Sequence, residues 1–213
     1  MDLGEIAIGI GYISKNTLSM EGQFTTFKHF RGGTGLQTES TDDMVVSTQE
    51  VKQPVSLPTE IVNMIQERIG GEYKAHFAYR AAANWCKNAN YKKASVFFDE
   101  GAQEELTHAK DLQDYLTQWN ILPEIPPANP HYDFKGLVHI IDEIYDVEYK
   151  LLLDYSKNAL SVLNSHPATF NFFQKYIDIQ NKSVGEFSDL LNALCLININ
   201  NKLDLLVFEE RYF

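Results

Sequence analysis

Hydrophobic residues recur at a helical period from residue 57 to the end of the chain. Apolar side chains return every three or four positions, which places them along one face of an α-helix. Four long segments show this pattern, and a short one follows them. The four inward stripes are Ile61, Ile65, Ile69, His76, Tyr79 and Ala83; Phe98, Gly101, Leu112, Tyr115 and Trp119; Leu137, Ile141, Ile144, Leu151, Tyr155 and Ala159; and Phe173, Ile177, Val184, Phe187, Leu191 and Leu194.

Local signals set the expected ends of these helices. Proline is favoured in a first helical turn, and aspartate can cap a helix start. The predicted limits are a first helix from Pro58 to near Cys86, a second from near Asn90, a third after Asp133, a fourth from Ser165 to Pro167 onward, and a final short helix at about 202–212.

The lengths of the connections predict the topology. Each main helix has about 30 residues and should be about 45 Å long. The first and third connections are short, so they join antiparallel neighbours. The middle connection, residues 120–132, contains four prolines. An extended proline-rich chain of this length covers about 40 Å and can return along the bundle. We therefore predict an all-α four-helix bundle with one long crossover between the second and third helices, plus a short C-terminal helix.

Residues 1–55 differ in character from the rest. They are rich in Gly, Ser, Thr and Gln, show no sustained helical period, and are predicted to form an irregular N-terminal extension. Phe24, Phe27 and Phe30 lie among threonines and could form a short strand or a docking surface. The alternative is a loosely held tail. The glycines at 32–35 lack the spacing of a phosphate-binding loop. Residues 56–213 are predicted to form the bundle domain.

Composition limits the function classes. The 213 residues are 44% hydrophobic and 22% charged, and the net charge is -11, which argues against a nucleic-acid partner and favours cations. No apolar run is long enough for a membrane span. The N-terminus has acidic residues where a secretory signal has basic ones. The two cysteines, Cys86 and Cys195, are expected to be buried, reduced thiols, so we expect a cytoplasmic protein.

Polar residues interrupt each of the four apolar stripes. Each predicted helix places at least one on its inward face, at a similar height along the bundle. These residues are Glu72, Glu105, His108, Glu148 and Gln180. Taken singly, each has an ordinary explanation, such as an ion pair, a rim position or a satisfied core amide. Their joint placement favours a site.

Three buried carboxylates need a positive partner. Isolated buried charges are costly and repel each other. Two divalent metal ions would offset the three negative charges, and a bridging hydroxide would complete neutrality. The spacing of three between Glu105 and His108 lets both reach one metal from one helix. Carboxylate and imidazole ligands without thiolates suit iron or manganese.

The segments that carry these residues resemble the ferritin family over about residues 57–213. Glu72 is followed by Tyr79, Trp85 and Cys86, as in the first helix of bacterial ferritins. The stretches GAQEELTHAKDLQDYLTQWNILP, DEIYDVEYK and HPATFNFFQKYIDIQ resemble the second, third and fourth helices. The last segment resembles the fifth helix.

The resemblance implies a ferroxidase centre. It would bind one iron through Glu72, Glu105 and His108 and a second through Glu105, Glu148 and Gln180, with Glu105 bridging. Tyr79 stands where the family has a tyrosine beside the centre. O2 or H2O2 would oxidise the ferrous pair, and the ferric product would be stored in a homo-oligomeric shell, usually of 24 subunits.

Several positions separate this chain from related classes. Leu151 stands where a second E-x-x-H motif would place histidine, which argues against bacterioferritins. The length and the fifth helix argue against the miniature ferritins that bind DNA. Lys182 and Ser183 stand where bacterial ferritins often carry carboxylates, which argues against a third iron site and leaves its existence open. No acidic residue lies between Tyr155 and Ile177, which predicts an unusual iron route.

Two functions follow from these features. The first is iron oxidation and storage. The alternative is a structural role, in which residues 1–55 bind a protein partner and dock the bundle in a larger assembly. The intact set of predicted ligands favours the first, and both could hold together.

Overall fold

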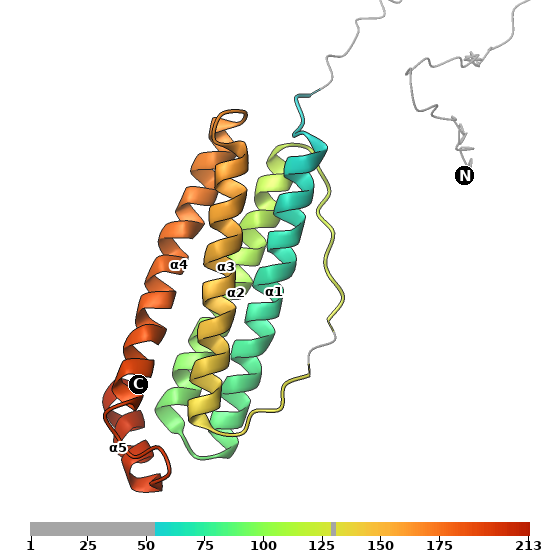
Figure 1. The fold of residues 1–213 in the computed structure, drawn as a ribbon. Coiled ribbons are helices and arrows are strands. Elements are labelled where there is room, and N and C mark those ends of the chain that lie inside the picture. The colour runs from blue at the N-terminus through green and yellow to red at the C-terminus, as the bar shows by residue number, and fades with distance from the viewer. Residues whose placement is uncertain (1–53, 129–130) are drawn as a thin grey trace, which may run out of the picture. The chain divides into compact units, whose positions relative to one another are not determined.

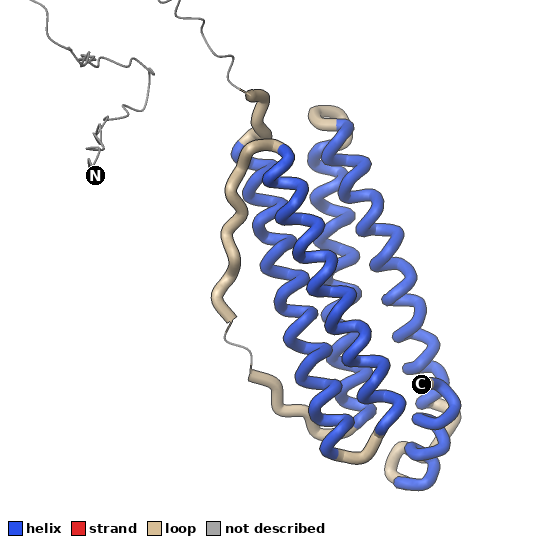
Figure 2. The backbone as a smooth tube through the Cα atoms, turned by 180° about the vertical axis from the view of Figure 1, so that it is seen from behind, coloured by secondary structure: helices blue, strands red, loops and turns tan. Residues whose placement is uncertain are grey.

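The computed structural model describes residues 54–128 and 131–213. It contains five α-helices and no strand in this part of the chain (Figures 1 and 2). The helices are α1 (Thr59–Asn88), α2 (Lys92–Gln118), α3 (Leu137–Val162), α4 (Pro167–Leu194) and α5 (Lys202–Tyr212). The predicted all-α bundle with a fifth helix is confirmed. The predicted extension and its docking or strand-forming segment lie outside the described residues, so the domain boundary at 55–56 stays a prediction.

Asparagine ends both helices of the first hairpin. Asn90 and Asn120 have φ of 66° and 60°, a left-handed conformation that asparagine tolerates better than most residues. The next residue in each case donates its backbone N–H back into the helix, from Tyr91 to Cys86 O and from Ile121 to Leu116 O. This Schellman geometry satisfies carbonyl groups that the helix end would leave without partners, and it turns the chain sharply.

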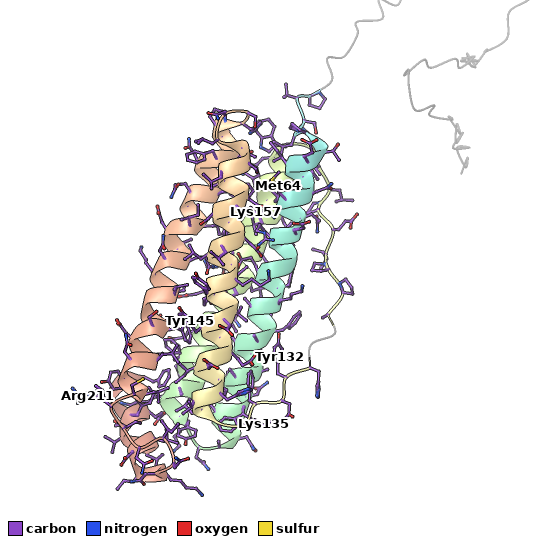
Figure 3. The ribbon with its side chains drawn as sticks, in the orientation of Figure 1. Met64, Tyr132, Lys135, Tyr145, Lys157 and Arg211 are labelled. Atoms are coloured by element: carbon purple, nitrogen blue, oxygen red, sulfur yellow. The ribbon has the colours of Figure 1, made fainter. Side chains whose placement is uncertain are left out.

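The crossover runs along the outside of the bundle, as predicted (Figure 1). Gln66 fastens its first part, because the side-chain amide both donates to the Glu124 carbonyl and accepts from the Glu124 N–H. Tyr132, labelled in Figure 3, fastens its second part by donating to the Lys74 carbonyl over 3.1 Å. The chain therefore returns to the starting end of α2, which makes α2 and α3 parallel.

Several predicted helix starts shift in the structure. Pro58 occupies the N-cap position, just before the first residue of α1, and α2 begins two residues after Asn90. Asp133 is no cap: α3 begins at Leu137 after Gly136, and Asp133 pairs instead with Lys135. His166 caps α4, because its ring nitrogen accepts from the Thr169 N–H.

The expectation for the cysteines is half right. Both thiols are free, and Cys86 is buried in the core. Cys195 is exposed, because it is the residue that follows the last turn of α4.

Two apolar clusters fill the bundle, and the polar positions lie where they meet. Along α2, Glu105 falls between Ala102 of the first cluster and Leu112 of the second. Along α3, Glu148 falls between Ile144 and Leu151 in the same way. The apolar ends therefore hold the helices in register around a polar middle.

The fifth helix packs on the end of the bundle through a buried glutamate. Glu209 Oε1 accepts from the backbone N–H groups of Lys93 and Ala94, at 2.6 and 3.1 Å. These are free donors in the first turn of α2, which has no side-chain cap of its own. The contact thus links the start of α2 to α5.

None of the helices in the described part of the chain has the length and hydrophobicity needed to span a membrane.

Candidate metal centre

The five predicted ligands come from four helices, and the structure buries most of them. Glu72, Glu148 and Gln180 have no exposed surface, and Glu105 is 3% exposed. The His108 side chain is 15% exposed. Charged and amide side chains are seldom this deep without a partner, so each needs a physical explanation.

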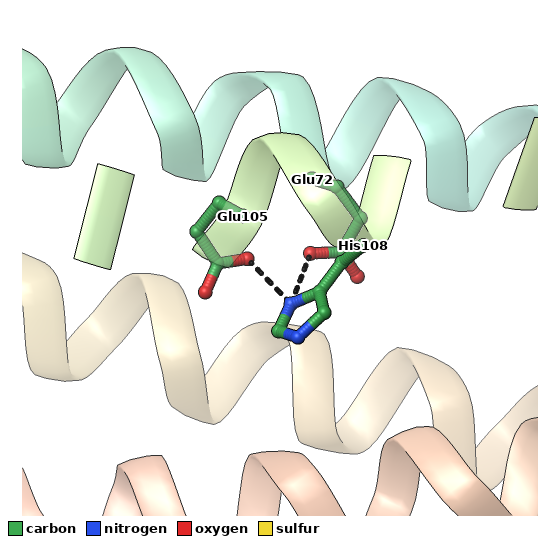
Figure 4. Close-up of side chains that lie close together, drawn as sticks. All are labelled: Glu72, Glu105 and His108. Atoms are coloured by element: carbon green, nitrogen blue, oxygen red, sulfur yellow. Dashed lines mark hydrogen bonds and ion pairs between the residues drawn. The ribbon is translucent and has the colours of Figure 1, made fainter. Parts of the chain in front are cut away.

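Three of these side chains form a tight group. One ligand atom from each of Glu72, Glu105 and His108 lies within 4.8 Å of the others. His108 Nδ1 lies 3.4 Å from Glu105 Oε2 and 3.8 Å from Glu72 Oε2, as the dashed lines in Figure 4 mark. The three-residue spacing on α2 puts His108 one turn beyond Glu105 on the same face. A single ion could bind all three.

Glu148 lies outside this tight group but is fixed by a predicted neighbour. The Tyr79 hydroxyl donates to Glu148 Oε1 over 2.6 Å, from α1 to α3. The Tyr79 ring packs against both Phe98 and Phe187, with centroids 6.1 and 6.0 Å away. Tyr79 therefore contacts the one acid that α3 contributes.

Several buried polar atoms of the site have no hydrogen-bond partner within the part of the protein that the structure describes. Seven buried side-chain atoms among the described residues have no hydrogen-bond partner, and four of them belong to predicted ligands. They are Glu72 Oε2, Glu148 Oε2 and both amide atoms of Gln180. Leaving such groups without partners costs about 1–3 kcal/mol each. Metal coordination would satisfy the oxygens.

The electrostatics of the buried side chains favour bound protons at Glu105, Glu148 and His108. Burial raises the pKa of Glu105 well above its usual range and that of Glu148 to about 7. Burial acts to lower the pKa of His108, but the neighbouring Glu105 and Glu72 carboxylates raise it to about 10. Burial also acts against the charged form of Glu72, yet the side chains of His108, Glu105 and Tyr155 outweigh it and lower its pKa. The site thus holds protons that an incoming cation would displace.

Among residues 54–128 and 131–213, no lysine or arginine forms an ion pair with the three buried acids of the site. Arg68 is the one Lys or Arg residue that the described chain buries, and its guanidinium pairs with Asp154 at 2.7 Å. His76, which shares the α1 stripe, makes a 2.6 Å contact from Nδ1 to the Ala102 carbonyl oxygen. The acids are therefore left to protons or to metal ions.

Tyr155 contacts the site although the sequence analysis treated it only as core. Its hydroxyl donates to Glu72 Oε1 from α3 to α1. Burial raises the pKa of this phenol well above its usual range, so it stays a donor. Tyr155 lies seven residues after Glu148, which places it on the same inward face two helical turns away. This spacing could have identified it as a neighbour of the site.

Leu151 confirms the asymmetry that the sequence predicted. It is buried, and it lies so close to α1 that a side-chain carbon at Gly71 would be 2.9 Å from Leu151 Cδ2. Position 151 is thus filled by apolar packing between α1 and α3 and offers no metal ligand.

Comparisons with known proteins agree with this geometry. A family model described as "Ferritin-like domain" matches residues 62–197. The bacterial non-heme ferritin of Escherichia coli O157:H7 is 28% identical over 142 residues, which cover 66% of this chain and 86% of that protein. The Campylobacter jejuni bacterial non-heme ferritin is 28% identical over 145 residues, with the same coverage.

Solved structures share the fold. The open pore ferritin of Archaeoglobus fulgidus superposes with a TM-score of 0.68 at 20% identity, covering 74% of this chain and 98% of that one. The Chlorobium tepidum ferritin gives a TM-score of 0.64 at 21% identity, covering 72% and 94%. Because the family model spans more than half of the sequence and the bundle matches as well, the chain belongs to the ferritin family.

Proposed function

We propose that this chain is an iron-oxidising and iron-storing subunit. It oxidises Fe(II) to Fe(III) at a centre for two iron ions inside one subunit. The proposed ligands are Glu72, Glu105, His108, Glu148 and Gln180. The observation that carries the proposal is the set of buried oxygens on Glu72, Glu148 and Gln180 that have no partner. The names of the relatives support iron storage.

The donor set fits ferrous iron. Carboxylate oxygen and imidazole nitrogen are suitable ligands for Fe(II), and no cysteine belongs to the tight group. Two ferrous ions supply two electrons. With two protons, these reduce O2 to H2O2, or reduce H2O2 to two waters. Glu105 and His108 give up their protons when the metal binds, which makes protons available beside the oxidant.

The shell is part of the same proposal. Exposed large apolar side chains include Leu122, Leu160, Leu196 and Leu203, each at least 65% exposed. Association of subunits would cover part of this apolar surface. Together with the ferritin neighbours, this supports a homo-oligomeric shell, proposed to contain 24 subunits, that holds ferric mineral. The two free thiols are compatible with a reducing cytoplasm.

Anaerobic ferrous titration tests the centre. We expect about two Fe(II) per chain, followed by rapid oxygen uptake on exposure to air. Glu105→Ala should abolish the rapid phase, because it removes a ligand that both ions share. Glu100→Ala is the matched control, since Glu100 is an exposed acid on the same helix. Wild-type rates in the Glu105 variant, measured by stopped flow, would contradict the assignment.

Electron microscopy after aerobic iron loading tests storage separately. Hollow particles with dense centres are expected. If the protein oxidises iron but its particles have no dense centres, the oxidase function would stand and the storage function would be refuted.

A further inference from the structure

Glu72 and Glu148 are the two carboxylates of the proposed centre that bind one ion each. In each of them, one oxygen accepts a hydrogen bond from a buried tyrosine and the other has no partner among the described residues. Tyr79 donates to Glu148 Oε1, and Tyr155 donates to Glu72 Oε1. The second oxygen of each acid is buried and has no partner. The two phenol contacts run in opposite directions, from α1 to α3 and from α3 to α1.

Aromatic and cationic groups pack against the Tyr155 ring. Its ring has no exposed surface and stacks on Tyr176, with centroids 4.8 Å apart and planes at 10°. Phe173 lies 6.2 Å away by centroid, and the Arg68 guanidinium lies 5.8 Å from the ring centroid. Stacking and cation–π contact both fix the ring plane, and thereby the direction of the hydroxyl.

The free oxygen of Glu72 faces the tight group. Glu72 Oε2 lies 3.8 Å from His108 Nδ1, while Oε1 is taken by Tyr155. A carboxylate with both oxygens free could rotate or bind an ion through both. With one oxygen held, Glu72 presents a single donor in one direction.

We propose that Tyr155 is a positioning residue, which holds Glu72 so that only Oε2 is offered to the metal ion shared with Glu105 and His108. This inference rests on the proposed two-metal centre and adds a residue to it. Outer contacts that orient a metal ligand commonly change metal affinity by about 10- to 100-fold when removed. The effect should fall on the ion bound by Glu72 and spare the ion bound by Glu148.

Tyr155→Phe tests this, because it keeps the ring, the stacking and the burial and removes only the hydroxyl. The probe is Co(II), titrated anaerobically into the full chain and followed by its visible absorption bands. Wild type should bind two ions per chain. In Tyr155→Phe, one of the two should bind about 10- to 100-fold more weakly. Tyr79→Phe should weaken the other ion instead.

Tyr115→Phe is the matched control. Tyr115 is a buried tyrosine whose hydroxyl lies 2.8 Å from Thr169 Oγ1, so its removal costs a comparable hydrogen bond away from any carboxylate. Thermal unfolding should shift similarly in both variants, but both cobalt affinities should stay at wild-type values in Tyr115→Phe.

The outcomes separate this inference from the proposed function. Two cobalt ions bound to Tyr155→Phe with wild-type affinities would overturn the positioning role and leave the centre intact. Equal weakening in Tyr155→Phe and Tyr115→Phe would also overturn it, because the effect would then be general destabilisation. Wild-type protein that binds no cobalt would instead refute the two-metal centre.

Discussion

At the scale of single residues, the contact between Tyr79 and Glu148 depends on a glycine in the neighbouring helix α2. Tyr79 reaches Glu148 because Gly101 offers no side chain to its ring: a Cβ at that position would lie 2.6 Å from two ring carbons. Carbon atoms in contact are normally about 3.5 Å apart. A methyl group would therefore displace the ring by about 1 Å from the position in which it packs against Phe98 and Phe187.

Gly101→Ala should therefore lower the free energy of unfolding and weaken the Tyr79–Glu148 hydrogen bond. Alanine in a helix interior is normally more stable than glycine by about 1 kcal/mol, so the steric cost must exceed this gain. Gly70→Ala is the control, because nothing lies within 4 Å of a Cβ there. We expect urea denaturation to show stabilisation at Gly70 and destabilisation at Gly101. Stabilisation of both variants would show that Tyr79 has room to move.

At the scale of the helices, α5 completes α2. The start of α2 lacks a local cap, and Glu209 supplies the acceptor from 115 residues away in sequence. An acid beside a helix N-terminus also interacts well with the helix dipole. This buried side chain therefore strengthens a joint between α2 and α5 to which the Lys93–Glu210 ion pair also contributes.

Glu209→Ala should loosen both elements. We expect the free energy of unfolding to fall by about 1–2 kcal/mol, because two backbone N–H groups lose their acceptor. Hydrogen exchange should accelerate at Lys93, Ala94 and the residues of α5. Glu210→Ala is the control, because Glu210 is exposed and its carboxylate pairs with the flexible Lys93 ammonium. Glu209→Gln keeps an acceptor oxygen and should retain part of the protection; unchanged exchange in Glu209→Ala would contradict the capping role.

The sequence predicted the elements better than their contacts. Helical period and proline content were enough for five helices and the crossover, because both are local properties. Asp133 was wrongly predicted as a cap, since a nearby Lys135 competes for its carboxylate. The Tyr155 contact with Glu72 spans 83 residues and depends on how α3 is rotated against α1, which no local pattern specifies.

For the molecule as a whole, the buried acids link stability to pH. Glu148 has a pKa of about 7 in the folded protein, against an ordinary value of 4.5. Between these values the folded state binds more protons than the unfolded chain, so stability falls as pH rises. His108 acts in the same direction: its contribution is complete below pH 6.5 and is lost as pH rises toward 10.

Metal-free protein should therefore be more stable at pH 5 than at pH 7, with about 2–3 kcal/mol contributed by Glu148. Urea denaturation at pH 5, 7 and 9 measures this. Glu148→Gln should flatten the change between pH 5 and 7. The stability of Zn(II)-loaded protein should decline less as pH rises, because deprotonated ligands bind metal better. A metal-free protein that gains stability from pH 5 to pH 7 would disagree with a protonated core.

The crossover joins two halves that meet at the centre. The hairpin of α1 and α2 carries Glu72, Glu105 and His108, and the hairpin of α3 and α4 carries Glu148 and Gln180. The loop between them contributes none of these groups, and Glu124 and Tyr132 hold it to α1 by hydrogen bonds. Two polypeptides, divided within the crossover, would each carry an incomplete set of ligands, and metal ions would favour their reunion. On the proposed function, the reassembly of two such polypeptides should therefore depend on ferrous iron.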